Sequence, residues 1–455
     1  MSTGWGTRVG EVVAPARLGR DFRWLLSSVW VGNLGDGLAI AAGPLLVAQQ
    51  TDSPFLIAMA ATLQWLPKLL FALPAGVVTD RVDRRVLVVC VDLVRVGVLG
   101  LLAASILTGT VSIAVVLVAL FLLGTAETFA DNASQTLLPM LVHRDDLAVG
   151  NARIQTGLIT FNQLAGPPVG ALLFAAGTAV PFLAQGLLVL AAIATIARVR
   201  LPDHGRDPET SSHVLHDVVE GFRWVWHHAA VRTLVLTLTV FNLTFGAAWS
   251  VLVLYATERL GMGEVGFGLI TTVGAVGGLA GTAAYGWITR RVSLGDLMRI
   301  GLVLETLTHL GLALTTSPVV ALAIFFVFGA HAFIWGTTSI TIQQRAVPTA
   351  LQGRVGGVYL LGCFAGLVSG GLLGGALAQA YGVTAPFWFA FVGSALLVVL
   401  IWGQLSHIAH ADAQDPEALD GPVSPGSPVG GAVADAVAPR PHPDAEQPGA
   451  GTATQ

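Results

Sequence analysis

The most regular feature of the sequence is a succession of long apolar segments separated by short polar or turn-rich breaks. Six of them lie near residues 24–48, 55–79, 86–107, 112–131, 153–176 and 180–199. After a polar stretch, six more lie near 231–256, 266–289, 297–315, 319–342, 355–380 and 384–406. A bilayer core about 30 Å thick needs about 20 apolar residues per helical span. The pattern therefore predicts an all-α membrane protein with twelve transmembrane helices.

Composition supports this prediction and excludes several classes of function. Of the 455 residues, 54% are apolar and only 11% are charged, against about 25% charged in soluble domains. The net charge of -4 provides no basic surface for a nucleic acid. Lys68 is the only lysine, so the Gly-x-x-x-x-Gly-Lys phosphate loop of an ATP-driven pump is absent. We expect no metal and no cofactor.

The arginines predict the orientation of the chain, because cytoplasmic loops carry an excess of arginine. They fall in alternate loops, at Arg81, Arg84 and Arg85, Arg144, Arg198, Arg200, Arg206 and Arg223, Arg290 and Arg291, and Arg345. Arg259 is the clear exception among the opposite loops. We expect a multi-pass protein of the plasma or inner membrane with both termini in the cytoplasm.

These features divide the chain into five parts. We expect a cytoplasmic N-terminal segment (1–23), a six-helix bundle (24–200), a cytoplasmic loop (201–230), a second six-helix bundle (231–407) and a disordered cytoplasmic tail (408–455). The tail is rich in Pro, Gly, Ala and Asp, a composition that cannot offset the entropy lost on ordering. Within the loop, Val214, Val218, Phe222 and Trp226 recur every fourth residue. This spacing predicts an amphipathic helix on the membrane surface.

The two bundles are related by an internal repeat. A shift of about 210 residues aligns Asn33 with Asn242, Gly37 with Gly246, Gly76 with Gly286, Arg81 with Arg291 and Gln135 with Gln344. A parallel 6+6 repeat predicts a substrate site near the bilayer midplane, where the two bundles meet.

At this point the chain resembles the major facilitator superfamily. The signature of that superfamily between the second and third helices, Gly-x-x-x-Asp-Arg-x-Gly-Arg-Arg, reads here Gly76-Val-Val-Thr-Asp80-Arg81-Val-Asp83-Arg84-Arg85. Asp83 replaces the usual glycine. The resemblance implies a gating loop that comprises Gly76, Asp80, Arg81, Arg84 and Arg85 with Glu127 and Asp131. In it, Asp80 faces the start of the eleventh helix and Arg84 meets the fourth-helix carboxylate Asp131.

A second motif is similar to one that antiporters of the superfamily carry in the fifth helix. It comprises Gly166, Pro167 and Gly170 within Ala165-Gly-Pro-Pro-Val-Gly170. Together with the segments around Gly32, Gly221 and Gly353, it resembles the drug:proton antiporter branch that contains macrolide-efflux proteins and enterobactin exporters. The resemblance therefore implies export rather than uptake.

Ionisable residues inside the apolar segments are the candidate site. A charge facing lipid at mid-helix costs roughly 2.5 to 3.5 kcal/mol on insertion scales, so these side chains should face protein or a watery cavity. Asp36 and Lys68 lie midway along adjacent segments and could pair there as a proton-coupling site, with Asn33 and Asn242 beside the substrate cavity. A purely structural ion pair is the alternative. Asp92 and Arg95, three residues apart, are expected to form a structural pair.

Histidines offer weaker signals. His309 and His331 lie within apolar segments, where they could relay protons or only bond a neighbouring helix. His213 and His216 have helical ligand spacing, but no further ligand follows nearby, so we interpret them as a solvated helix face.

The sequence is thus best interpreted as a secondary transporter that exports a lipophilic or amphiphilic small molecule in exchange for protons. Its expected partners are that molecule, protons and membrane lipid, and we expect a monomer. Proton-coupled uptake of an organic solute is one alternative. A multipass membrane enzyme is another, although no nucleophile, base and orienting group share one membrane depth.

Overall fold

A computed structural model describes residues 15–201 and 214–404, and all regular structure in these ranges is helical. The first part contains α2 (Gly19–Gln50), α3 (Pro54–Thr62), α4 (Leu66–Arg81), α5 (Arg84–Leu107), α6 (Ile113–Leu141), α7 (Leu147–Gly157), η3 (Leu158–Ala165), α8 (Gly166–Ala176) and α9 (Val180–Ile196). The second contains α10 (Val214–His227), α11 (Ala229–Trp249), α12 (Leu252–Leu254), η4 (Tyr255–Arg259), α13 (Gly263–Ile288), α14 (Leu294–Leu314), α15 (Pro318–Ala346), α16 (Gln352–Tyr381) and α17 (Ala385–Ile401).

Ten helical segments in the described ranges are long and apolar enough to cross a membrane. Two shorter apolar helices, α9 and α17, have 17 residues each. The prediction of an all-α, multi-pass membrane protein is therefore confirmed. The expected tail (408–455), most of the N-terminal segment and residues 202–213 lie outside the described residues.

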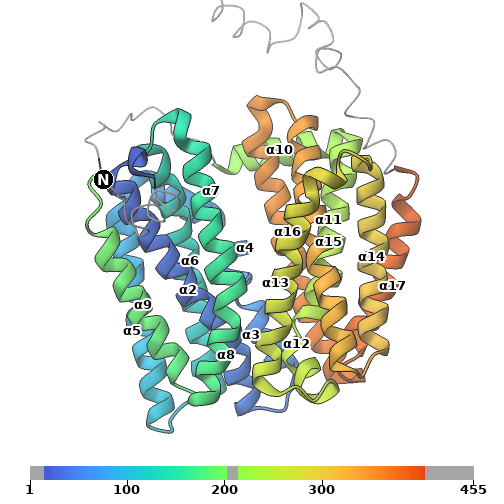
Figure 1. Cartoon of the computed structure of the whole chain (residues 1–455), viewed down its shortest axis with the longest axis horizontal. Coiled ribbons are helices and arrows are strands. Elements are labelled where there is room, and N and C mark those ends of the chain that lie inside the picture. Colours follow the sequence, from blue (N-terminus) through green and yellow to red (C-terminus); the bar gives the residue numbers. More distant parts are fainter. Residues whose placement is uncertain (1–14, 202–213, 405–455) are drawn as a thin grey trace, which may run out of the picture. The chain divides into compact units, whose positions relative to one another are not determined.

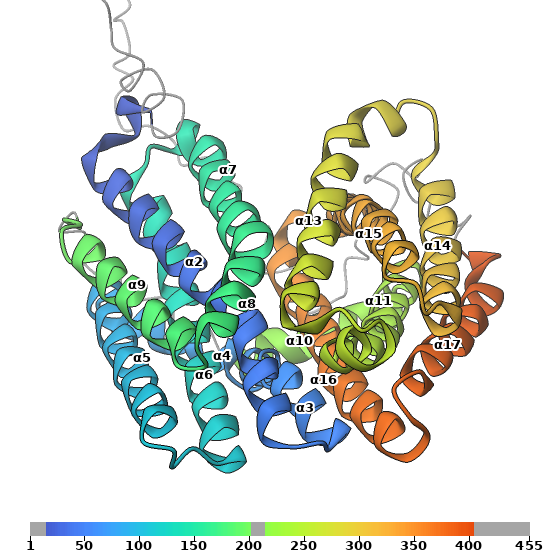
Figure 2. The same cartoon turned by 60° about the horizontal axis from the view of Figure 1, so that its bottom comes forward.

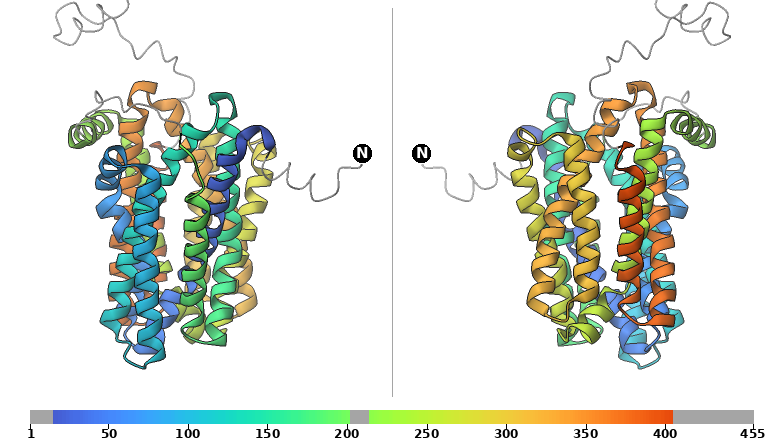
Figure 3. Two further views of the ribbon diagram at one scale, coloured as in Figure 1. Left: turned by 90° about the vertical axis from the view of Figure 1, so that its left-hand side faces the viewer. Right: turned by 90° about the vertical axis from the view of Figure 1, so that its right-hand side faces the viewer.

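The helices pack in two groups, which Figures 1 and 2 show side by side. In the first group, α2 packs against α8 and α9, α5 against α6 and α9, and α4 against α6. In the second group, α11 packs against α16 and α17, α13 against α15, and α14 against α15 and α17. The amphipathic segment α10 lies across one end of the second group and contacts α16 (Figure 3).

The two groups touch mainly through two pairs of helices, α3 with α16 and α8 with α13, with smaller contacts of α13 with η3 and of α16 with α4. Small residues allow the close approach. A Cβ added to Gly375 of α16 would lie 2.8 Å from the Cβ of Ala58, and one added to Gly268 of α13 would lie 2.9 Å from the Cβ of Ala171. Packing of this kind holds membrane helices together where lipid provides no hydrophobic drive.

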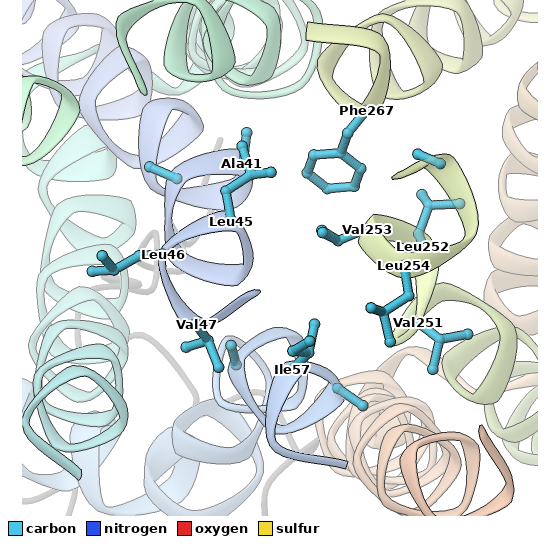
Figure 4. Close-up of a cluster of buried hydrophobic side chains, with 14 of the residues drawn as sticks. Ala41, Leu45, Leu46, Val47, Ile57, Val251, Leu252, Val253, Leu254 and Phe267 are labelled. Carbon is cyan, nitrogen blue, oxygen red and sulfur yellow. The ribbon is translucent and has the colours of Figure 1, made fainter. Parts of the chain in front are cut away.

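The buried apolar side chains join the groups at one end only. One cluster contains Ala41, Leu45 and Ile57 from the first group together with Val253 and Phe267 from the second (Figure 4). At the opposite end, where the arginine-rich loops lie, two separate clusters form. One contains Phe22, Leu87 and Ile196 of the first group, and the other contains Val231, Ile342 and Val355 of the second.

A π-helical segment, η3, precedes the Gly-Pro motif in the first group. Pro167 and Pro168 have no backbone N–H, so the carbonyls one turn earlier lose their usual donors, and the wider turns of η3 accommodate that loss. Directly after it, Gly166 and Gly170 lie against the backbone of α2 at Gly37 and Leu38. The motif thus sits where α8 crosses α2.

The linker helix α10 is attached to the start of α16 by charge. Arg354 lies 2.9 Å from Asp217 and 2.9 Å from Glu220, and Gly221 packs against the backbone carbonyl of Arg354. Val225 is buried, whereas Phe222 and Trp226 are 56% and 55% exposed and stack on each other. The exposed apolar face agrees with a helix lying on a membrane surface.

The packing of α16 on α11 leads to a first prediction. Gly370 faces the carbonyl of Leu243 with no room for a Cβ, whereas Gly357 on the same helix has open space. We expect Gly370→Ala to destabilise the protein by about 1 to 3 kcal/mol through overpacking. Gly357→Ala is the matched control and should be neutral or slightly stabilising, because alanine favours helix. Thermal unfolding of the purified protein in detergent measures both, and equal melting temperatures would contradict the packing.

Candidate functional site

A buried ion cluster lies midway along three helices of the first group. Arg95 of α5 donates to Asp36 of α2, and its other terminal nitrogen lies 3.1 Å from Asp92. Gln185 of α9 is 3.5 Å from the same Asp36 oxygen. The side chains of Arg95, Asp92 and Asp36 are 5%, 6% and 11% exposed. We call these four residues the sealed cluster.

A second and more open cluster surrounds Lys68, which lies at the middle of the membrane segment Pro54–Arg81. The Lys68 amine is 3.1 Å from Glu127 and 3.8 Å from Asp131, both on α6. Their side chains are 25%, 27% and 53% exposed in the same order. Ionised groups at this depth face protein interior or water rather than lipid. We call Lys68, Glu127 and Asp131 the open cluster.

The open cluster lies beside the boundary between the two groups. Lys68 is 5.7 Å from the ring centre of Trp65, and Trp65 stacks at 6.3 Å on Phe364 of α16. An amine next to an aromatic face is attracted to it and presents an apolar surface with a charge beside it.

Together the two clusters contain more negative than positive groups. Four carboxylates, Asp36, Asp92, Glu127 and Asp131, face two cations, Arg95 and Lys68. The clusters are close enough for Asp36 to interact electrostatically with Glu127 and Asp131. If every group is ionised, two negative charges remain uncompensated in a region of low dielectric, which is costly. The site therefore favours the binding of protons or of a cation.

The prediction that Asp36 pairs with Lys68 is wrong, because the structure shows neither residue in contact with the other. Asp36 is instead bound to Arg95 of α5. The helix α2, which carries Asp36, packs against α9, and α9 packs against α5. The helix α4, which carries Lys68, packs against α6. Lys68 consequently meets the carboxylates of α6. The expected Asp92–Arg95 pair is present, but Arg95 also holds Asp36, so the pair is part of a larger cluster.

The expected contact of Arg84 with Asp131 is also absent. Arg84 donates to the carbonyl of Thr136 and to the sulfur of Met140, which lie further along α6 than Asp131. Asp131 lies with Lys68. Arg84 is 3.9 Å from Asp80, whose side chain is 63% exposed. Asp131 and Glu127 therefore belong to the open cluster rather than to the loop.

Two other residues of the loop, Asp83 and Arg85, bond backbone groups. Asp83, which replaces the family glycine, caps α5 by accepting hydrogen bonds from the backbone N–H groups of Arg85 and Val86. Arg85 donates to the carbonyl of Val199. Gly76 has open space around it.

Asn33 and Asn242 occupy equivalent places in the two groups. Each donates to the carbonyl four residues earlier in its own helix, at Val29 and Leu238. Asn242 is buried and lies against Gly366 of α16. It therefore packs between helices rather than lining a cavity.

Sequence reasoning missed Gln185. It is 2% exposed, and its side-chain oxygen has no hydrogen-bond partner in the described part of the chain. It is the only amide within α9. Its isolation among apolar residues was a signal that it faces another polar group.

Comparisons with known proteins agree with this architecture. The model of the transmembrane secretion effector family matches residues 12–433. The multidrug efflux pump Tap of Mycolicibacterium fortuitum is 28% identical over 384 residues, covering 80% of this chain and 90% of Tap. The enterobactin exporter EntS of Shigella boydii is 26% identical over 401 residues, covering 84% and 92%.

A solved structure has the same fold. It is the crystal structure of a bacterial homologue of the human lysosomal transporter Spinster, in an inward-facing and unoccupied conformation. The TM-score is 0.65 at 12% identity, covering 87% of this chain and 98% of that one.

The difference in burial between the two clusters leads to a second prediction. Arg95→Met leaves Asp36 and Asp92 buried without a cation, which should cost about 3 to 5 kcal/mol. Lys68→Met leaves carboxylates that are partly exposed, so we expect a loss of about 1 kcal/mol or less. The melting temperatures of the two purified variants test this order. Equal losses would mean that the clusters do not differ in solvent access.

Proposed function

This chain belongs to the transmembrane secretion effector family of the major facilitator superfamily, and from that membership we propose that it is a secondary exporter of lipophilic or amphiphilic small molecules, driven by inward proton flow. The proposal places it in the cell membrane, with twelve spans in two six-helix bundles and both termini in the cytoplasm. Ten spans are long apolar segments. The 17 residues of α9 and of α17 are at the lower limit for a span.

The observation that carries the proposal is the excess of carboxylates around Arg95 and Lys68 at the middle of the spans. Protons can neutralise that excess, and so can a cationic or amphiphilic molecule. The two compete, because each lowers the energy of the same buried charges. Competition of this kind exchanges protons for substrate. A proton that crosses with a potential of 100 mV contributes about 2.3 kcal/mol.

The direction of transport is proposed from two lines of support. The Gly166-Pro167-Gly170 motif lies at the crossing of α8 and α2 and resembles that of antiporters. The relatives are named as a multidrug efflux pump and an enterobactin exporter. Both names describe export, which favours export over uptake for this chain.

The arrangement of the apolar clusters supports alternating access. The groups share a cluster at the end away from the arginine-rich loops and have separate clusters at the end beside them. If those loops are cytoplasmic, this is a conformation closed to the outside. The opposite state requires the shared cluster to separate and the loop at Asp80 to approach the second group.

The third prediction tests proton coupling. In everted vesicles with an acidified lumen, wild type should accumulate radiolabelled erythromycin or another transported amphiphile. Asp36→Asn removes one excess charge and should reduce this accumulation by about tenfold while exchange of labelled for unlabelled compound persists. Glu258→Gln, an exposed carboxylate in the second group, is the control. If Asp36→Asn accumulates the compound as wild type does, Asp36 has no part in coupling.

The fourth prediction tests alternating access. Ser53 of the first group donates to Gln379 of the second at 2.9 Å. In a background without Cys90 and Cys363, a disulfide between Ser53→Cys and Gln379→Cys should hold the groups together and abolish transport until it is reduced.

A disulfide between Thr108→Cys and Thr110→Cys joins two positions of one loop, whose hydroxyls are 3.0 Å apart, and serves as the matched control. It should leave transport unchanged. Normal transport by the oxidised Ser53/Gln379 variant would contradict separation of the groups at this end.

A further inference from the structure

A cluster of three ionisable side chains is buried in the second group, outside the site described above. Glu305 and His309 lie one turn apart on α14, with His309 Nε2 2.9 Å from one carboxylate oxygen. His331 of α15 places its Nε2 3.5 Å from the other oxygen. Glu305 and His331 are near the middle of their helices, so the cluster lies at mid-membrane depth.

The cluster is more deeply buried than the sites of the first group. The side chains of Glu305, His309 and His331 are 0%, 1% and 3% exposed. Glu305 Oε2 and His331 Nε2 face only each other, at a long 3.5 Å, and His309 Nδ1 has no hydrogen-bond partner in the described residues. A side-chain brace selected only for stability would bond these atoms more fully, because an unsatisfied buried polar group costs about 1 to 3 kcal/mol.

Charge counting limits the protonation states of this cluster. With no added proton it carries the single negative charge of Glu305, and with one proton on an imidazole it is neutral. In an apolar interior a neutral cluster is lower in energy than a charged one, so the sealed geometry favours the binding of one proton. Release of that proton leaves a buried negative charge, which requires water to reach the cluster.

The helices packed around the cluster provide no compensating charge at its depth. α17 has no ionisable side chain, and α13 contributes Tyr285, which contacts Thr338. α16 contributes Tyr359, which bonds Ser339. The arginines of α11 and α15, Arg232 and Arg345, are at the helix ends.

Aromatic side chains separate the cluster from α11. Phe241 of α11 stacks on Trp335 at 4.8 Å, and the rings of Phe241 and Phe328 lie 6.4 Å and 6.0 Å from His331. His331 is therefore the member closest to α11, directly behind these rings. Rearrangement of the rings would give water access to His331 first.

A metal ion is not the ligand that this geometry fits. No group of three histidine, cysteine or acidic side chains among the described residues is arranged to hold one. A proton needs only the single carboxylate and the imidazoles, each of which lies beside one oxygen of that carboxylate.

We propose that Glu305, His309 and His331 form a second protonation site. The site binds a proton while the cluster is buried and releases the proton when the rings beside His331 rearrange and water reaches the cluster. The proton leaves from an imidazolium to water and returns to the same imidazole from water, so no other reactant is needed. This inference rests on the proposed proton-coupled export and adds the second group to the coupling machinery.

The experiment uses the full-length protein with two variants, Glu305→Gln and His331→Gln. Glu258→Gln and His143→Gln, at exposed positions, are the matched controls for accumulation and exchange. In proteoliposomes, accumulation of radiolabelled erythromycin driven by a pH gradient is compared with exchange of labelled for unlabelled erythromycin. Separately, proton uptake by purified protein is measured on acidification, without any transported compound.

We expect both variants to lose about tenfold in gradient-driven accumulation while exchange stays within about twofold of wild type. Glu305→Gln should also take up about one proton fewer per molecule than wild type, because it removes the negative charge that the proton neutralises. If Glu305→Gln does not fold, the loss of accumulation with unchanged exchange in His331→Gln decides the matter, because its nitrogen is further from the carboxylate and its loss leaves the Glu305–His309 contact intact.

Other outcomes overturn the proposal. If proton uptake and accumulation are both unchanged in the variants, the cluster does not titrate. If accumulation and exchange fall equally while proton uptake is unchanged, the cluster is only a structural brace. If wild type shows no gradient-driven accumulation of any compound, the proposed function fails. The uptake measurement still decides then whether the cluster binds a proton.

Discussion

The buried guanidinium of Arg95 is the interaction on which the first group depends. It connects α5 to α2 by holding Asp36 and Asp92 at once, and Gln185 brings α9 to the same point. An ionised carboxylate inside a membrane protein is tolerated only with such a partner. The partner therefore dictates which helices must be neighbours. The small residues at Gly37, Gly166 and Gly170 allow α8 to pack on the other side of α2 without disturbing this arrangement.

The same constraint divides the charges of the site into two kinds. Groups held by Arg95 are sealed, so they fix the positions of α2, α5 and α9 and also contribute to the excess charge of the site. Lys68, Glu127 and Asp131 are partly exposed, and they lie next to Trp65, which stacks on a helix of the second group. A change in the protonation or occupancy of the open cluster therefore alters contacts at the boundary between the groups. A change in the sealed cluster alters contacts inside the first group only.

Much of the fold could be predicted from the sequence, because span length and arginine placement are properties of one segment at a time. Each predicted apolar segment is helical, although some are divided, as 55–79 is between α3 and α4. The depth of Asp36, Lys68, Arg95 and Glu127 could be read from their positions along those segments. The partner of each charged side chain could not be predicted in this way. Asp36 and Lys68 are on consecutive segments, yet the lateral packing of α2 with α9 and of α4 with α6 assigns them to different partners. Depth is a local property, whereas lateral neighbours depend on the packing of all the helices.

The helix α16 combines the contacts that any movement of the two groups must change. At one end Gly375 lies against Ala58 of α3, and in the middle Phe364 stacks on Trp65 beside Lys68. At the other end Arg354 binds Asp217 and Glu220 of α10, the helix that follows the connection between the groups. Because a helix is stiff, a tilt of α16 cannot alter one of these contacts and leave the others unaffected. The ion pairs of α10, the aromatic stack and the glycine contact are consequently coupled, and the open cluster lies next to the middle one.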